Sequence, residues 1–187
     1  DELPEFNRSA LEILRQPLED REVTISRVNS TITYPADFML AAAMNPCPCG
    51  YLGDGDKCRC TQNEIVKYTG KISGPLLDRI DIQVEVSAIK YDDLYDKKKG
   101  ETSEEIRKRV LKAHKIQLER YKNDNIQFNS QLTAPLIEKY CSLGEEEKAM
   151  LKMAFDKLSL SARGYHKILK VARTVADLDG SEDIKLK

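Results

Sequence analysis

The sequence predicts an α/β region over residues 1–89, followed by an all-α region over residues 101–187. Two patterns indicate the α/β region. Asp37–Met44 is almost wholly apolar, as in a parallel strand buried on both faces, and Ile80–Val86 alternates apolar and polar residues, as in a half-buried strand. The segment from Lys90 to Gly100 is charged and irregular, and apolar residues at helical spacing follow it. We therefore expect a domain boundary in this segment.

The first elements of the chain are expected to be a helix and a β-hairpin. Asn7 is a favourable N-cap for the helix, and Pro17 should end or bend it. Glu22–Tyr34 is rich in β-branched residues that partly alternate with polar ones, and Asn29 and Ser30 supply a turn. The hairpin would therefore precede the first of the two buried strands.

Helices are expected through the second region. Thr102 and Glu105 have the spacing of a capping box, which predicts that a helix begins there. Apolar spacing predicts further helices near Ala134–Cys141, Glu145–Leu158 and Ala162–Leu178.

Charge and hydropathy exclude two classes of protein. Thirty Lys and Arg against 31 Asp and Glu give a net charge of −1. This balance excludes a globally basic nucleic-acid coat protein, so any DNA contact must come from a local patch. The longest apolar run, Phe38–Met44, is far shorter than the roughly 20 residues that cross a bilayer, and no membrane partner is expected. The acidic opening Asp1–Glu5 does not resemble a signal peptide, which predicts a cytoplasmic protein.

Four of the five cysteines are clustered in one short segment, as Cys47, Cys49, Cys58 and Cys60. Four thiolates satisfy a closed tetrahedral zinc site, which would stiffen a loop that has no core of its own. The C-x-C spacing is tighter than the usual C-x₂-C of a zinc knuckle, so reduced thiols or adventitious disulfides remain the alternatives. The lone Cys141 is expected to be a small core residue.

An ordered series of polar residues runs through the chain: Asp1 and Glu2, then Asn45 after the first buried strand, Arg79 before the second, and Arg163 in the last helix. Catalytic groups lie at strand ends in open α/β sheets. Each residue alone also fits an ordinary role: a solvated terminus, a turn before Pro46, an ion pair with Asp78 or Asp81, or a helix-surface charge.

Together these motifs resemble the AAA+ ATPases, and among them the magnesium-chelatase-like family in its competence-protein-M type. The resemblance covers nearly the whole chain and lies in four segments: Asp1–Phe6, Ala41–Asp54, Ser73–Val86 and Leu160–Leu178. It implies the second half of a AAA+ α/β core with a hairpin insert, followed by a helical lid.

The resemblance also implies a role for each polar residue of the series. Asp1 completes the Walker B motif and would hold Mg²⁺, and Glu2 would activate the attacking water. Asn45 falls on sensor 1, which orients that water. Arg79 matches the arginine finger, which acts on ATP held by a neighbouring subunit. Arg163 matches the sensor 2 arginine of the lid and would contact bound ATP.

The family further implies a homo-oligomeric ring, hexameric in the parent protein, that processes DNA. The hairpin would then point into the ring's pore, where Arg27, Asn29 and Ser30 would meet a nucleic-acid backbone. A simple extension of the sheet fits the hairpin equally well.

One motif of the family is missing from the sequence. The phosphate-binding loop needs G-x-x-x-x-G-K-[ST], and Gly50–Lys57 departs from it at the lysine position. The sequence therefore resembles the C-terminal part of a longer ATPase and is expected to be inactive alone. Two alternatives remain: a chelatase subunit that inserts Mg²⁺ into a porphyrin, and a non-enzymatic interaction module stabilised by zinc.

Overall fold

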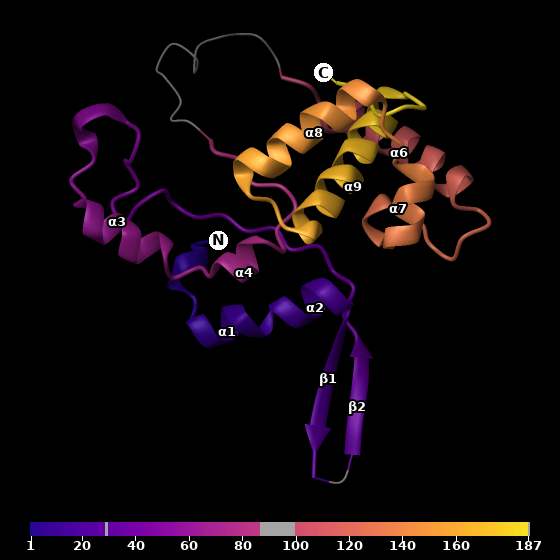
Figure 1. Ribbon diagram of the computed structural model, residues 1–187. Helices are drawn as coiled ribbons and strands as arrows, with labels where there is room; N and C mark the ends of the chain where they lie inside the picture. Colours follow the sequence, from indigo (N-terminus) through magenta and orange to yellow (C-terminus); the bar gives the residue numbers. More distant parts are fainter. Residues whose placement is uncertain (29, 87–99, 187) are drawn as a thin grey trace. The chain divides into compact units, whose positions relative to one another are not determined.

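The computed structural model describes residues 1–28, 30–86 and 100–186 (Figure 1). The chain divides into two compact units, residues 1–96 and 97–187, which are described separately. The first unit contains, in chain order, η1 (Leu3–Glu5), α1 (Arg8–Ile13), α2 (Arg15–Asp20), β1 (Glu22–Arg27), β2 (Ser30–Pro35), η2 (Gly55–Lys57), α3 (Gln62–Thr69) and α4 (Gly74–Leu77).

Local sequence signals determine how the first unit begins. The Asn7 side chain accepts a hydrogen bond from the Ser9 N–H at 2.9 Å and so caps α1, as predicted. The helix is interrupted at Leu14, and Pro17 lies in the first turn of α2, where a missing N–H removes no helical hydrogen bond. α1 and α2 are thereby placed on a small apolar core made by Leu3, Leu11, Ile72 and Leu76, with Leu14, Leu18 and Leu77 packed against it.

The predicted β-hairpin is confirmed. β1 and β2 are antiparallel, with Glu22 opposite Pro35 and Arg27 opposite Ser30. Neither face of the hairpin is covered, because every described residue of the two strands except Val23 is exposed (Figure 1). The hairpin therefore adds little to the core of the unit. Asn29 lies outside the described residues.

The prediction of two buried strands is wrong for this chain. Residues 37–44 and 80–86 form no strand, and Met39 and Val84 are 91% and 76% exposed. Among the described residues β1 and β2 form the single sheet, so the first unit is more helical than the predicted α/β region. A strand exists only where a neighbour completes its hydrogen-bond ladder. The apolar pattern marks residues that favour burial, but it does not supply that neighbour.

The second unit is helical, as predicted. Its elements are α6 (Ser103–Arg120), η3 (Asn129–Gln131), α7 (Ala134–Tyr140), α8 (Glu145–Leu158) and α9 (Ala162–Asp179). The capping box at the start of α6 is present, with Thr102 and Glu105 each accepting from the other's backbone N–H. Its core is an apolar cluster of Tyr121, Leu132, Ile137, Cys141, Leu169, Ala176 and Ile184, so the prediction for Cys141 is confirmed.

A buried charged network joins α6, η3 and α9. The Asp177 carboxylate is fully buried, and it accepts from Arg120 Nη1 at 2.9 Å, from Arg173 Nε at 3.2 Å and from Asn129 Nδ2 at 2.9 Å. The hydrogen bond to Asp177 raises the pKa of Arg120, so the guanidinium stays charged. Several partners for one carboxylate offset its desolvation and determine how the three elements pack.

No helix in the described part of the chain combines the length and the apolar character that crossing a bilayer requires.

Candidate functional site

Glu2 and Asn45, which are far apart in sequence, line one cavity of about 370 Å³ in the first unit. They are brought together by the backbone, because the Leu3 N–H donates to the Ala43 carbonyl at 3.1 Å. We call this the Glu2–Asn45 cavity. Its remaining lining comes from η1, the cysteine segment and the α3 region: Glu5, Pro48, Glu64, Lys67, Tyr68 and Lys71.

The start of α3 is fixed by a capping box that forms one wall of the cavity. The Thr61 N–H donates to Glu64 Oε2 at 2.8 Å, and the Glu64 N–H donates to Thr61 Oγ1 at 3.3 Å. The backbone N–H of Thr61 and then its hydroxyl lower the pKa of Glu64. Beyond α3, Lys71 Nζ pairs with Glu5 Oε1 at 3.3 Å and so ties this wall to η1.

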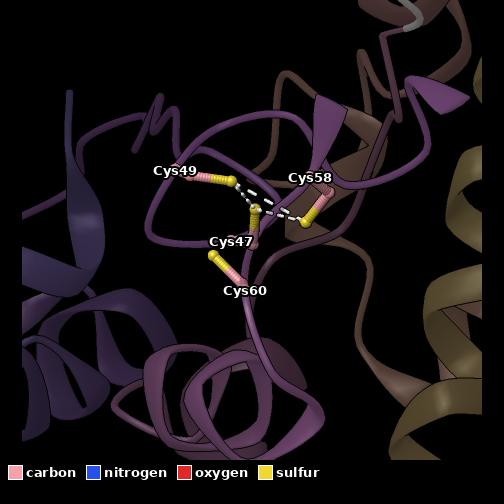
Figure 2. Close-up of side chains that lie close together, drawn as sticks. All are labelled: Cys47, Cys49, Cys58 and Cys60. Carbon is pink, nitrogen blue, oxygen red and sulfur yellow. Dashed lines mark hydrogen bonds between the residues drawn. The ribbon is translucent and has the colours of Figure 1, made fainter. Parts of the chain in front are cut away.

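The four clustered cysteines converge on one point, as Figure 2 shows. Cys47 Sγ lies 3.4 Å from Cys49 Sγ and 3.8 Å from Cys58 Sγ, and Cys49 and Cys58 are 3.7 Å apart. With Cys60 included, all four sulfur atoms lie within 4.8 Å of one another. Tetrahedral zinc with Zn–S bonds of about 2.3 Å places its sulfurs about 3.8 Å apart. The cluster therefore fits a zinc ion, and the tight C-x-C spacing does not prevent this.

The sulfur atoms of the cluster differ in proton affinity. The backbone N–H groups of Tyr51 and Arg59, followed by the thiol of Cys60, donate to Cys49 and lower its pKa to about 6. The bond that the Cys60 thiol makes to Cys49 raises the pKa of Cys60 to about 12. Cys49 therefore gives up its proton more readily than Cys60, and a divalent cation would displace the protons of the thiols that it binds.

Asp1, which the family resemblance assigns to Mg²⁺, precedes Glu2 in the chain. Asp1 is exposed, and its carboxylate accepts the Glu2 N–H at 2.9 Å. It is absent from the described residues that line the Glu2–Asn45 cavity. The structure thus brings Glu2 and Asn45 together directly, with Asp1 adjacent through the chain.

Arg79 lies at the end of α4, and its guanidinium is held within its own unit. Nε donates to the Arg15 carbonyl at 2.9 Å and Nη1 donates to the Pro75 carbonyl at 2.7 Å, while Nη2 pairs with the Glu19 carboxylate of α2. The Arg79 side chain is only 12% exposed. Sequence reasoning missed Glu19, because nothing local relates two residues that lie so far apart in the chain.

The remaining predicted residues lie in other parts of the molecule. Arg163 is exposed in the first turn of α9, in the second unit, next to the N-cap Ser161. Arg27 and Ser30 face each other as the last strand pair of the hairpin, and both are exposed.

The α3 wall was not identified from the sequence. Lys67, Tyr68 and Lys71 line the cavity, yet none belongs to a motif that the sequence analysis used. A usable signal was present, because Thr61 and Glu64 have capping-box spacing directly after Cys60 and so predict a helix beside the cysteine segment.

The chain is similar to known proteins along its whole length. Residues 1–94 match the family described as "Magnesium chelatase, subunit ChlI", and residues 100–187 match "Magnesium chelatase, subunit ChlI C-terminal". Competence protein ComM of Haemophilus influenzae is 45% identical over 185 residues, which are 98% of this chain and 35% of ComM.

Two further relatives extend the comparison. The uncharacterized protein YifB of Escherichia coli is 39% identical over 186 residues, which are 98% of this chain and 36% of YifB. An uncharacterized protein of Mycobacterium tuberculosis is 36% identical over 180 residues, which are 96% of this chain and 35% of that protein. The chain therefore spans about a third of the length of the relatives it matches. Because the first family profile covers half of the residues and the second covers most of the others, this chain belongs to the magnesium chelatase subunit ChlI family.

Proposed function

We propose that this chain carries the water-activating half of a AAA+ ATPase site together with its helical lid. The observation that carries the proposal is the shared cavity of Glu2 and Asn45. A carboxylate can take a proton from an attacking water, and a side-chain amide beside it can hold that water in line. Asp1, next to Glu2, would complete the Mg²⁺ shell, since Mg²⁺ is held by one or two carboxylates plus substrate phosphates.

The cradle for the phosphates of ATP would come from the remainder of a longer polypeptide. The chain covers about a third of its relatives, and the phosphate-loop motif is missing from its sequence. A loop of backbone N–H groups followed by a lysine is what binds the β- and γ-phosphates in such enzymes. This chain alone is therefore expected to be inactive.

Arg79 would serve a neighbouring copy of the protein in a ring. Its guanidinium is oriented by two carbonyl oxygens and by Glu19, so it is preorganised at the end of α4. A nucleotide bound to the adjacent subunit would replace Glu19 as the anionic partner of Nη2. Arg163, in the lid, would contact ATP held by its own subunit. The family resemblance supports a hexamer as the ring.

DNA is the substrate that we assign to the ring. The support is the identity with a competence protein and the uncovered hairpin, which ends in Arg27 and Ser30. A guanidinium and a hydroxyl are typical partners of phosphate oxygens and carry no base specificity. This favours DNA processing over Mg²⁺ insertion into a porphyrin.

The cysteine cluster would hold a structural zinc ion. All four coordination positions would be filled by thiolates, so such an ion has no open position for substrate and contributes to the stability of the fold.

The test of the ATPase assignment uses the complete gene product. It should hydrolyse ATP with Mg²⁺, and Glu2→Gln should lower turnover by about 10²-fold or more while ATP still binds. Glu138→Gln, an exposed carboxylate of α7, is the matched control and should keep full turnover. A complete protein that binds zinc but never hydrolyses ATP would favour the interaction module instead.

A further inference from the structure

The cysteine loop, defined here as residues 47–60, is continuous at both ends with walls of the Glu2–Asn45 cavity. At its start, only Pro46 separates Asn45 from Cys47. At its end, Cys60 is followed directly by Thr61, the N-cap of α3. The first and last thiols of the cluster are therefore attached to the two elements that carry Asn45 and the α3 wall.

The turn at Gly50 also lies close to the Asn45 side chain. The Gly50 N–H donates to the Cys47 carbonyl at 3.0 Å, and Gly50 has a φ of +82°, which favours glycine. A Cβ added at Gly50 would lie 3.8 Å from Asn45 Cγ, in ordinary van der Waals contact, so this turn lies close to the amide with room for about one carbon atom between them. Pro48, between the first two thiols, lines the cavity itself.

The loop has almost no core that would hold this arrangement in place. All of its residues are described, and Cys47 is the only one that is fully buried. Its regular structure is limited to η2, a single 3₁₀ turn. Within the loop, the convergence of the four sulfur atoms is therefore the main feature that holds its two ends together. The core cluster that includes Leu3 and Ile72, together with the Lys71–Glu5 pair, holds the far end of α3.

We propose that a divalent metal ion bound by the four cysteines acts as a clamp that positions Asn45 against Glu2 and the α3 wall, so that metal occupancy sets the rate of hydrolysis. The proposal rests on the proposed ATPase function. In it the cysteines are positioning residues, because none of the four is among the described residues that line the cavity and they act through Asn45.

The clamp predicts a specific kinetic signature. Misplacing a water-orienting amide by about 1 Å can cost on the order of 10²-fold in rate, because the attacking geometry is lost. Nucleotide affinity depends mainly on the phosphate contacts and should change little. Loss of the metal should therefore lower kcat between about tenfold and hundredfold at nearly constant KM.

The test uses the complete gene product with two matched variants. Cys58→Ser/Cys60→Ser removes two thiols, and Arg59→Ser introduces a serine between them while all four thiols remain. We expect the control to bind one zinc per chain with wild-type kcat. The double variant should bind no zinc, and its kcat should be lower than that of the wild type. In the wild type, a zinc-selective chelator with excess Mg²⁺ should lower kcat, and added zinc should restore it.

Two further measurements separate positioning from a general loss of structure. Asn45→Ala should lower kcat, and adding the double cysteine change to it should cause no further loss, because both act through one group. Amide hydrogen exchange should accelerate at residues 45–71 on chelation, while exchange in α6 and α9 stays unchanged.

Each outcome decides the proposal. Wild-type protein without zinc, or unchanged exchange at residues 45–71 after metal removal, would overturn it whether or not ATP is hydrolysed. Independent, additive effects of Asn45→Ala and the cysteine change on kcat would also overturn it, and the ATPase assignment would stand. Absence of turnover in zinc-loaded wild type, with exchange still metal-dependent, would overturn the proposed function while the clamp itself remains.

Discussion

Arg79 makes three hydrogen-bonded contacts within one unit, and the family resemblance assigns it to the nucleotide of a neighbour. In the complete gene product, Arg79→Ala should lower ATP turnover by roughly 10³–10⁵-fold, because the charge that a finger places on the transition state is lost. Binding of ATP by the same subunit should persist. Both quantities can be measured by steady-state turnover and by equilibrium titration with labelled nucleotide.

Mixing experiments show whether Arg79 acts across an interface. A mixture of Arg79→Ala and Glu2→Gln proteins contains interfaces in which one subunit supplies Arg79 and the other supplies Glu2. Turnover should therefore recover partly at intermediate ratios. If no ratio gives recovery, Arg79 acts only within its own unit, through Glu19 and the two carbonyl oxygens.

The thiols of the cysteine loop predict how zinc affinity depends on pH. The pKa of Cys60 is raised to about 12, so its proton must be displaced at any working pH, and affinity falls as pH falls. The pKa of Cys49 is lowered to about 6, so below that pH its proton competes as well and the decline steepens. Competition with a colorimetric chelator between pH 5 and pH 8 measures this. A constant affinity across that range would contradict thiolate ligation.

Asp177 is the residue on which the buried network of the second unit depends. Asp177→Asn leaves Arg120 and Arg173 without their carboxylate, and breaking a buried ion pair costs about 3–5 kcal/mol. The urea concentration at the midpoint of unfolding of the second unit should therefore fall. Asp183→Asn, an exposed change in the same segment, should leave the midpoint unchanged within error.

At the scale of elements, the helix N-caps could be predicted from the sequence, and the pairing of strands could not. The helix starts at Asn7 and Thr102 follow from side chains that reach N–H groups two or three residues away. The two expected strands depend on neighbours that lie elsewhere in the fold, and the described residues do not supply them. The cysteine cluster could be anticipated because four thiols so close in sequence have few possible roles, whereas the Glu19–Arg79 pair left no local signal.

The hairpin is the element to test for DNA binding. Arg27→Ala should weaken binding to DNA of any sequence to a similar extent. The slope of log affinity against log salt concentration should become smaller by about one, as expected for the loss of one phosphate contact. Arg8→Ala, an exposed arginine of α1, is the control. Affinities measured by fluorescence anisotropy at several salt concentrations decide the matter, and an unchanged salt slope would favour a purely structural hairpin.

At the scale of the whole molecule, this chain alone should bind ATP negligibly. The residues that we propose activate water are present, but the sequence lacks the phosphate-loop motif, which provides most of the affinity for a triphosphate. Isothermal titration of the 187-residue chain should show no micromolar binding, and the complete gene product should show it. Micromolar affinity in the chain alone would mean that an unrecognised phosphate site exists within it.

The uncovered hairpin also has a consequence for how such proteins diversify. Because neither face of β1 and β2 is buried, most substitutions there change the free energy of folding by no more than about 0.5 kcal/mol. Substitutions of the four cysteines have no such freedom, since their sulfur atoms all lie within 4.8 Å of one another. The hairpin can therefore acquire new binding preferences by drift while the cysteine cluster stays constant, and the proposed motor could in this way be adapted to many substrates.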